Sequence, residues 1–132
     1  MKPAKELYKG GTVFFFRPPN GETVELVVIS SAGPLCVGRV YDYVKKEVVV
    51  GLYWIYIRNH GAKLGPFFAE LGLADKAMKK ILKHLGKEFF EQPIEWIARQ
   101  DAVRDWLWAN IGKNDDLIGG EWAKSEEDKE ST

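Results

Sequence analysis

Apolar and polar positions alternate through much of the first half of the chain, and this pattern predicts four β-strands. Asn20-Gly21 lies between two apolar runs and predicts a tight hairpin, because a type I′ turn needs two residues with positive φ. Lys45-Lys46 predicts a second two-residue turn. Short connections between consecutive strands favour an antiparallel meander. The strands are expected over residues 12–17, 22–30, 35–44 and 47–58.

A two-residue turn at Lys45-Lys46 sets the expected register of the long hairpin over residues 35–58. It places Tyr41 opposite Val50. Because side chains alternate between the faces of a strand, each face receives its own set of residues. One face then carries aromatic and basic residues, namely Arg39, Tyr41, Tyr43, Trp54, Tyr56 and Arg58. The other face carries Cys36, Val40, Val49, Tyr53, Ile55 and Ile57.

After His60 the apolar spacing becomes that of helices. Pro66 is suited to the first position of a helix and is expected to open a short one. Asp75 is expected to cap a longer helix that Gly86 ends. The apolar stripe of this helix is Ala77, Met78, Ile81, Leu82 and Leu85, and its opposite face carries Lys76, Lys79, Lys80 and Lys83.

Pro93 opens a second long helical stretch, which Gly112 ends and which Asp101 could divide into two helices. Residues 87–91 are expected to add one further turn. The sequence therefore predicts an α+β fold, in which a four-stranded antiparallel sheet is followed by four or five helices packed on it.

Charge divides the chain into a basic body and an acidic tail. Lys plus Arg and Asp plus Glu number 19 each, so the formal net charge is zero. We expect one domain over residues 1–113, which is long enough to bury a core, and a flexible tail over residues 114–132. The acids of this tail are Asp115, Asp116, Glu121, Glu126, Glu127, Asp128 and Glu130, against Lys124 and Lys129.

The aromatic and basic face of the long hairpin is the strongest functional feature of the sequence. Aromatic rings stack on the bases of single-stranded nucleic acid, and basic side chains contact its phosphates. Strand alternation delivers a side chain about every 6.6–6.8 Å on one face, which suits splayed bases. We therefore expect sequence-independent binding of single-stranded DNA, with single-stranded RNA as a further ligand. The predicted stacking residues are Tyr41, Tyr43, Trp54 and Tyr56, and the predicted phosphate contacts are Arg17, Arg39 and Arg58.

Two other interpretations stay open. The aromatic rings can instead form core beneath the helices, which would suit a protein-interaction or assembly module. The basic helix over residues 75–85, preceded by the segment ELGLAD, also fits a helix–turn–helix binder of duplex DNA, in which the short helix opened by Pro66 and a glycine in the turn come before the longer basic helix. A solvated lysine face explains the same helix more simply.

Tryptophan spacing predicts self-association. Trp106 and Trp108 lie two positions apart on the last predicted helix and therefore point to different faces. One can enter the core, while the other is left exposed or buried in a partner. We expect a homo-oligomer that associates through the Trp-rich C-terminal helix.

Enzyme chemistry is not indicated. His60 and His84 are too few and too far apart for a metal site, and no nucleophile-elbow or phosphate-loop motif is present. We expect no catalytic residue, metal or cofactor. Cys36 is the single cysteine, which excludes an intramolecular disulfide, and we expect it to be buried. The sequence shows no signal peptide and no segment of transmembrane length, so we expect a cytoplasmic protein without membrane contact.

Four segments combine aromatic, basic strands with a Trp-rich helix, namely FFFRPPNGETVELVV, GRVYDYV, VGLYWIYIRNH and EWIARQDAVRDWLWANI. Their order and character over residues 10–112 resemble the ThermoDBP family of single-stranded DNA-binding proteins from hyperthermophilic archaea. The resemblance implies an aromatic cleft between sheet and helices, with a basic rim, that binds single strands without sequence preference. It also implies oligomerisation through the C-terminal helices. The chain lacks a sustained leucine heptad, so a zipper-type dimer is not expected.

Overall fold

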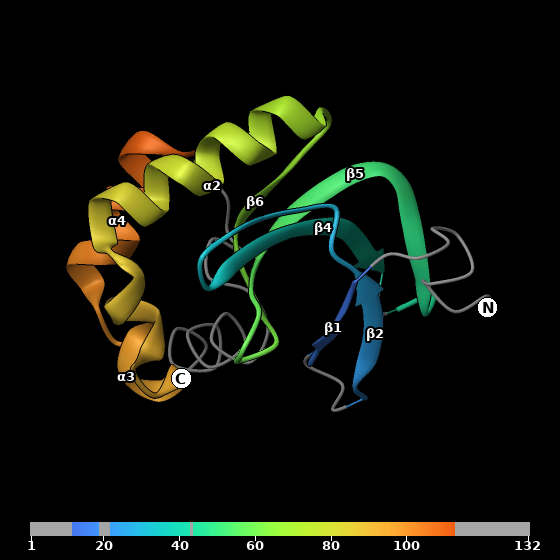
Figure 1. Cartoon of the computed structure of the whole chain (residues 1–132), viewed down its shortest axis with the longest axis horizontal. Helices are drawn as coiled ribbons and strands as arrows, with labels where there is room; N and C mark the ends of the chain where they lie inside the picture. The colour runs from blue at the N-terminus through green and yellow to red at the C-terminus, as the bar shows by residue number, and fades with distance from the viewer. Residues whose placement is uncertain (1–11, 19–21, 43, 113–132) are drawn as a thin grey trace, which may run out of the picture.

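The computed structural model describes residues 12–18, 22–42 and 44–112, in which six strands precede three α-helices (Figure 1). The predictions for the Asn20-Gly21 turn, Tyr43 and the acidic tail lie outside the described residues. The strands are β1 (Val13–Phe16), β2 (Val24–Val27), β3 (Ser30–Ala32), β4 (Leu35–Asp42), β5 (Glu47–Ile57) and β6 (Ala62–Phe68). The helices are α2 (Leu71–Leu85), α3 (Ile94–Ala98) and α4 (Asp101–Asn110), with the 3-10 helix η1 (Lys87–Glu91) between α2 and α3.

The strands form two antiparallel sheets and not the single meander that the sequence predicts. β1 pairs with β2, while β3, β4, β5 and β6 form a four-stranded sheet in that order. The division occurs because the expected strand over residues 22–30 changes partner. The N–H group of Val28 still donates to Thr12 beside β1, whereas that of Ile29 donates to Val37 of β4. A four-stranded antiparallel sheet is present, but β3 and β6 replace β1 and β2 in it.

The segment around Pro66 is a strand, and the short helix predicted there is wrong. β6 pairs with β5 from Ala62 opposite Ile57 to Phe68 opposite Tyr53. Proline lacks the N–H group that an inner strand needs, but β6 lies at the edge of its sheet, where proline is tolerated.

Helix α2 begins earlier than predicted, at Leu71, so Gly72 lies inside a helix and not in a turn. The predicted helix–turn–helix is therefore wrong, because a strand precedes α2 where its first helix would lie. Asp75 does not cap the helix. Its carboxylate instead accepts a hydrogen bond of 2.5 Å from Ser30 Oγ of β3.

The other helical boundaries agree better with the sequence. Gly86 ends α2, and η1 forms the expected turn. The stretch after Pro93 is divided into α3 and α4, with α4 beginning at Asp101. Three α-helices are present in the described residues, which is fewer than the four or five predicted.

The turn of the long hairpin contains four residues and not the two predicted. Asp42 pairs with Glu47 across this turn. The carboxylate of Asp42 accepts hydrogen bonds of 3.0 Å from the N–H groups of Val44 and Lys45. A side chain that caps its own turn in this way is characteristic of aspartate.

A bulge changes the register a second time. Val40 pairs with Val49, but the preceding residue of β4, Arg39, pairs with Tyr53 and not with Val50. Gly51 lies in this interruption with φ +94°, which suits a residue without a side chain. A one-residue change of register moves side chains to the opposite face. The predicted face is therefore correct only in part. Tyr41, Trp54 and Tyr56 do share one face, but Arg39 lies on the other, and Cys36 and Val40 join the aromatic rings.

The β1–β2 hairpin also differs from the predicted register by one residue. A two-residue Asn-Gly turn would place Arg17 opposite Val24. In the structure Val24 pairs with Phe16, and Leu26 pairs with Phe14. Phe14 and Phe16 therefore share a face with apolar partners, and this face is turned to the four-stranded sheet.

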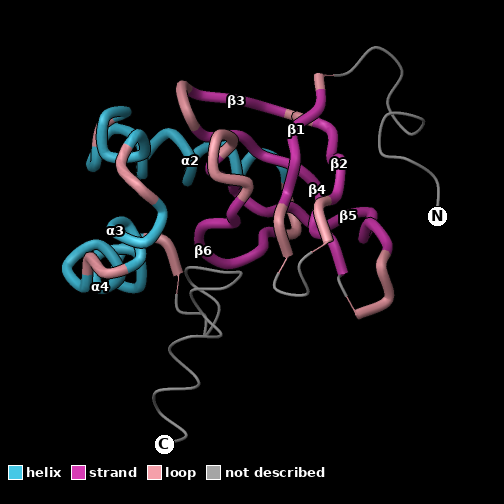
Figure 2. The backbone as a smooth tube through the Cα atoms, turned by 90° about the horizontal axis from the view of Figure 1, so that it is seen from below, coloured by secondary structure: helices cyan, strands magenta, loops and turns pink. Residues whose placement is uncertain are grey.

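The four-stranded sheet lies between helix α2 and the β1–β2 hairpin (Figures 1 and 2). It separates two hydrophobic cores. Helix α2 covers one face, and the β1–β2 hairpin covers the other. The helix-side core is centred on Leu35, Val37, Ile55, Ile57, Leu64, Ala74, Met78 and Ile81, which are all buried. The hairpin-side core contains Phe14, Phe16, Leu26, Cys36, Val40, Tyr41, Trp54 and Tyr56.

Candidate nucleic-acid interface

Three of the four rings predicted to stack on bases lie in the hairpin-side core. Tyr41, Trp54 and Tyr56 have exposed fractions of 2%, 8% and 0%. Phe16 of β1 contacts all three rings, with centroid distances of 6.3, 6.2 and 5.2 Å. The β1–β2 hairpin thus occupies the surface on which bases were expected to stack. Tyr41, Trp54 and Tyr56 are therefore core residues, as the alternative interpretation of the sequence proposed.

The buried tyrosine hydroxyl groups stay uncharged. Burial raises the pKa of Tyr56 well above 10, and burial together with the negative charge of Glu22 raises the pKa of Tyr41. The hydroxyl of Tyr56 donates a hydrogen bond of 2.7 Å to the carbonyl oxygen of Arg39. This satisfies a polar group that would otherwise destabilise the core.

Arg39 is separated from the rings that it was predicted to accompany. It pairs with Tyr53, and its guanidinium carbon lies 5.9 Å from the centroid of the Tyr53 ring. Such an arrangement is a cation–π contact. Arg39 is half-buried on the helix side of the sheet, opposite the face of Trp54 and Tyr56.

The β5–β6 turn, residues 58–61, links the two sheets. The backbone N–H of Arg58 donates to the carbonyl of Pro34 at 3.0 Å. The carbonyl of Gly61 accepts a hydrogen bond of 2.7 Å from the backbone N–H of Arg17, which directly follows β1. These two bonds position both arginine residues relative to one turn.

The same turn is attached to the helical layer. The Nε2 atom of His60 lies 3.0 Å from the carbonyl oxygen of Phe90, and Asn59 Nδ2 donates to the same oxygen at 3.4 Å. Phe90 belongs to η1 and is fully buried. The turn is therefore held on one side by the strands and on the other by a buried element.

Gly61 is required at its position in this turn. Its φ is +68°, and a Cβ atom there would lie 2.6 Å from the carbonyl oxygen of Phe15. Both the conformation and the close approach of β1 exclude a side chain. The contact between the β5–β6 turn and β1 consequently depends on this glycine.

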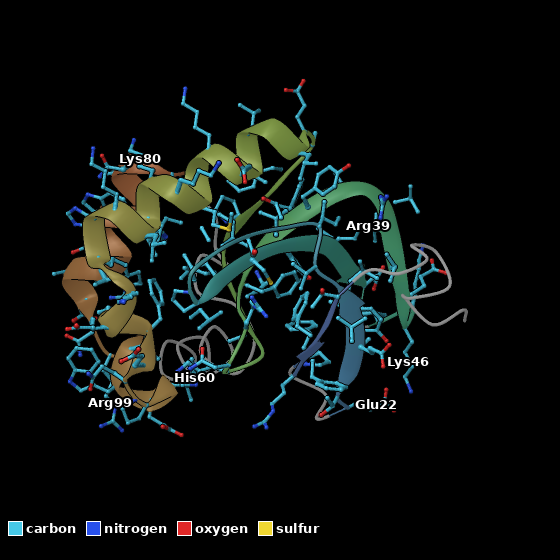
Figure 3. All side chains as sticks on the ribbon, in the orientation of Figure 1. Glu22, Arg39, Lys46, His60, Lys80 and Arg99 are labelled. Atoms are coloured by element: carbon cyan, nitrogen blue, oxygen red, sulfur yellow. The ribbon has the colours of Figure 1, made fainter. Side chains whose placement is uncertain are left out.

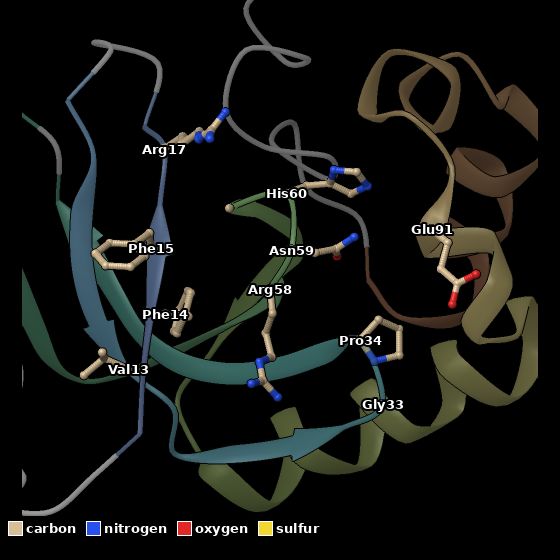
Figure 4. Close-up of a pocket in the computed structure, with 11 residues that line it drawn as sticks. Val13, Phe14, Phe15, Arg17, Gly33, Pro34, Arg58, Asn59, His60 and Glu91 are labelled. Atoms are coloured by element: carbon tan, nitrogen blue, oxygen red, sulfur yellow. The ribbon is translucent and has the colours of Figure 1, made fainter.

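A groove of about 590 Å³ lies beside the turn, between β1, the β3–β4 connection and η1 (Figure 4). Arg17 and Arg58 contribute exposed side chains to it, and Asn59 and His60 lie between them in the view of Figure 4. The volume falls within the range of small-ligand pockets, about 300–1,000 Å³. Other lining residues are Phe15, Pro34 and Glu91. We call this feature the turn groove.

The turn groove offers positive charge beside an exposed ring. Arginine is protonated at every physiological pH, so Arg17 and Arg58 are permanent cations. Phe15 is 57% exposed and belongs to the same lining. Glu91 adds one carboxylate. Phosphate recognition by the arginines and stacking on Phe15 are the chemistry that this arrangement can perform.

Two of the three predicted phosphate contacts, Arg17 and Arg58, are brought together here, while Arg39 is not. Sequence reasoning did not select Phe15 or His60. The alternation of the VFFF segment could have identified Phe15, because Phe14 and Phe16 point into the core and the residue between them must point outward. His60 lines the groove because of the conformation of the β5–β6 turn, which no alternation of apolar and polar residues predicts.

Lys63 is a further residue that sequence reasoning did not select. It is 2% exposed, and its Nζ atom lies 4.5 Å from the centroid of the Trp54 ring. The contact arises because β6 pairs Lys63 with Tyr56, next to Trp54 on the neighbouring strand. The sequence pattern predicts no strand over residues 62–68, so it could not predict this cation–π contact.

Several other sequence predictions concern groups outside the turn groove. Cys36 is buried as expected, and burial raises its pKa to about 12. Across the described ranges, no three or more His, Cys, Asp and Glu side chains gather into a possible metal site. None of the helices in these ranges has the length and apolar character needed to cross a membrane.

Comparison of the chain with models of protein families, with curated proteins and with solved structures yields no match. The geometry of the turn groove is therefore the basis for assigning a function.

Proposed function

We propose that the protein binds single-stranded nucleic acid without sequence preference, and that the turn groove is its primary contact surface. One observation carries this proposal: Arg17 and Arg58, which come from different sheets, line the same groove, and Phe15, whose ring is exposed, borders this groove on β1. The ligand is single-stranded DNA, with single-stranded RNA as a second substrate of the same chemistry.

The two arginines would contact backbone phosphates. A planar guanidinium group can donate two parallel hydrogen bonds to a phosphate. Arg17 and Arg58 have fixed backbone positions, because each is bonded through its N–H group to a neighbouring loop. Contacts to the backbone carry no sequence information, which fits binding without sequence preference.

Phe15 takes the stacking role that the sequence assigned to the buried rings. Its side chain points away from the hairpin-side core, since it pairs with Glu25 on the outer face of the β1–β2 hairpin. Stacking on an aromatic ring contributes about 1–3 kcal/mol per base and tolerates any base. Tyr41, Trp54 and Tyr56 then act indirectly, by fixing the hairpin that presents Phe15 and Arg17.

Fluorescence anisotropy with a labelled oligo-dT tests this assignment. We expect the double variant Arg17→Gln/Arg58→Gln to bind at least about tenfold more weakly at low salt. Loss of two phosphate contacts should lower the slope of log K against log salt by about 1.4, since each contact to a single strand contributes about 0.7. Phe15→Ala should weaken binding with little change in that slope.

Arg99→Gln is the matched control, because Arg99 is exposed at the end of α3 and does not line the groove. Equal effects of Arg99→Gln and the double variant would refute the turn groove as the contact surface. Failure of the wild-type protein to bind oligo-dT at low salt would refute the function itself. A labelled duplex and an oligo-U in the same assay report the preference for strandedness and sugar.

A second candidate function, self-assembly, is favoured by the helical layer. Trp96 of α3 and Trp108 of α4 are 45% and 42% exposed, and exposed aromatic residues of this kind are enriched at protein interfaces. Trp106, by contrast, is half-buried and stacks on His84 with a centroid distance of 4.0 Å. This distribution is the one expected if α4 uses one tryptophan for the core and another for a partner copy. Sedimentation of wild type and Trp108→Ala over a concentration series would measure it.

A further inference from the structure

The outer face of α2 carries a stripe of lysines that the turn groove does not use. Lys76, Lys80 and Lys83 are all exposed and lie within about 60° of one another around the helix, at 100° per residue. Seven residues of helix separate the first from the last, which is about 10 Å. Lys79 extends the stripe on one side. We call these four residues the lysine stripe.

Few negative charges accompany the lysine stripe. In the part of the chain that the structure describes, the ion pairs involve one of its members, Lys79, which lies 2.9 Å from Asp75. Like charges three and four residues apart on a helix repel one another and destabilise it. A stripe of this kind therefore favours an anionic occupant.

The C-terminal end of α4 lies against the lysine stripe. The Nζ atom of Lys80 donates a hydrogen bond of 3.3 Å to the carbonyl oxygen of Asn110, the last residue of α4. One turn farther along α2, His84 stacks on Trp106 of α4. Figure 3 labels Lys80 within this helical layer, which lies on the other side of the sheet from Glu22 and Lys46.

The chain after Asn110 carries the densest negative charge of the sequence. Seven acids and two lysines lie between residues 115 and 130. The N–H groups of Ile111 and Gly112 both donate to the carbonyl of Leu107, so the free length of chain begins after Gly112. At about 3.3–3.6 Å per residue, the three residues from Gly112 to Asp115 can span up to about 11 Å, and the eighteen residues from Gly112 to Glu130 up to about 65 Å. The acidic segment is therefore long enough to reach the lysine stripe, of which Lys80 already contacts Asn110.

We propose that the lysine stripe of α2 is a docking surface for the acidic segment of the same chain, residues 115–130. Covalent connection holds the segment at an effective concentration in the millimolar range, which allows many weak ion pairs to act together. The docked segment screens the stripe from other polyanions. Nucleic acid is thereby directed to the turn groove, and the stripe becomes available to a polyanion when the segment leaves. The docking itself does not depend on the proposed function.

Carbodiimide cross-linking of the full-length protein tests the docking directly, because the reagent joins carboxylates to lysines without a spacer. At low salt we expect peptides of residues 115–130 to be joined mainly to Lys76, Lys80 and Lys83. The yield should fall severalfold at about 1 M salt, where the screening length is about 3 Å. Equal cross-linking to Lys45, which is also exposed and lies in the hairpin turn, would overturn the proposal.

An equal mixture of ¹⁴N- and ¹⁵N-labelled protein distinguishes the same chain from a second copy. Products that carry a single isotope support docking within one chain, and a statistical share of mixed products overturns it. The full-length variant Lys76→Gln/Lys80→Gln/Lys83→Gln lacks the amines that the reagent couples, so cross-linking cannot report docking in this variant.

NMR spectroscopy supplies a second measurement that needs no lysine chemistry. The amide chemical shifts of α2 are compared between wild type and a variant whose seven tail acids are changed to amides. Shifts confined to α2 support docking there, whereas shifts confined to Arg17 and Arg58 would place the segment in the turn groove.

The affinity for oligo-dT at low salt tests whether the docked segment screens the lysine stripe from other polyanions. Neutralising the seven tail acids should tighten binding about tenfold, and this gain should disappear in the triple lysine variant. A gain that survives the lysine changes but disappears with Arg17→Gln/Arg58→Gln would overturn docking on the stripe. If no form of the protein binds oligo-dT, the cross-linking result still decides the docking, so the two proposals fail separately.

Discussion

The two faces of the four-stranded sheet are covered in different ways. On the helix side, aliphatic residues such as Ile55 and Ile57 meet Met78 and Ile81 of α2, a helix of 15 residues. On the hairpin side, aromatic rings meet β1 and β2, which have four residues each. A short hairpin offers few side chains, so each must bury a large area. Phenylalanine, tyrosine and tryptophan, which bury about 150–250 Å² each, meet that requirement.

The aromatic residues of the sheet have a different role in the folded chain from the one that the strands alone suggest. A set of tyrosines and tryptophans on one sheet face looks like a ligand platform when the strands are considered alone. In the folded chain the β1–β2 hairpin is the occupant of that face, with the Phe14 and Tyr56 ring centroids only 4.7 Å apart. The part of this region that stays accessible is the rim, where Arg17, Arg58 and Phe15 line the turn groove. Aromatic residues on a strand therefore indicate a binding face only when no other part of the chain can cover them.

The largest effects are expected when one central side chain of each core is removed. Phe16 and Ile81 are both fully buried. We expect Phe16→Ala to lower the free energy of unfolding by about 3–5 kcal/mol and Ile81→Ala by about 2–5 kcal/mol, measured by urea denaturation. Phe16→Ala removes contacts to three rings, so it should also release the hairpin locally.

Hydrogen exchange separates these local effects. The amide of Arg17, which donates to Gly61, should exchange faster in Phe16→Ala than amides of α2 do. Ile81→Ala should show the reverse order. Equal acceleration of both regions by both variants would mean that the two cores unfold as one unit, and the distinction between them would have no energetic meaning.

The link between the β5–β6 turn and β1 should be the next most sensitive feature. We expect Gly61→Ala to cost the strain of a positive φ, about 1–2 kcal/mol, and additional energy for displacing the carbonyl of Phe15. Gly51→Ala is the matched control, because Gly51 also has a positive φ but a Cβ atom there would meet no atom within 4 Å. Thermal or urea unfolding of both variants measures the difference. A loss for Gly51→Ala as large as that for Gly61→Ala would contradict a specific steric role of the turn.

The smallest effect concerns a polar link on the helix side, between α2 and β3. The hydrogen bond from Ser30 and the neighbouring Lys79 lower the pKa of Asp75 below its usual 3.8. A carboxylate with a lowered folded pKa stabilises the protein above the unfolded pKa, and this contribution is lost as the pH falls through the folded value. At pH 7 we expect Asp75→Asn to lower the free energy of unfolding by about 1 kcal/mol.

Urea unfolding at several pH values tests this dependence. The stability difference between wild type and Asp75→Asn should shrink as the pH falls from 3.8 through the lowered folded pKa of Asp75, because the carboxylate is then protonated. Asp105→Asn is a control, since Asp105 is exposed on α4. A difference that stays constant down to pH 2 would show that the Ser30 hydrogen bond does not depend on the charge of Asp75.

Local patterns in the sequence predicted those features that depend on neighbouring residues. Gly86 and Asp101 divide the helical half correctly, because capping and helix termination are decided within one or two turns. The burial of Cys36 follows from its place in an apolar strand. Pro66 was misread because proline suits both a helix start and an edge strand, and only the sheet around it shows which applies.

The candidate site was predicted in part for the same reason. Arg17 and Arg58 lie at strand ends, where side chains reach the surface, and both line the turn groove. The register of β4 and β5 was wrong because Asp42 closes a four-residue turn and a bulge near Gly51 adds residues to one strand. Two local changes thus moved Arg39 away from Trp54 and Tyr56.

The sequence by itself determined the α+β class, the antiparallel pairing of neighbouring strands, most helix ends and the exposure of Arg17 and Arg58 at strand ends, because these depend on short-range pattern. The tertiary structure alone decided which strands share a sheet, that a hairpin covers the aromatic face, and that Phe15 and His60 join Arg17 and Arg58. Those outcomes depend on contacts between residues far apart in the chain. The decisive example is the bond between Arg17 and Gly61, which attaches the first hairpin to the β5–β6 turn and so forms one side of the groove.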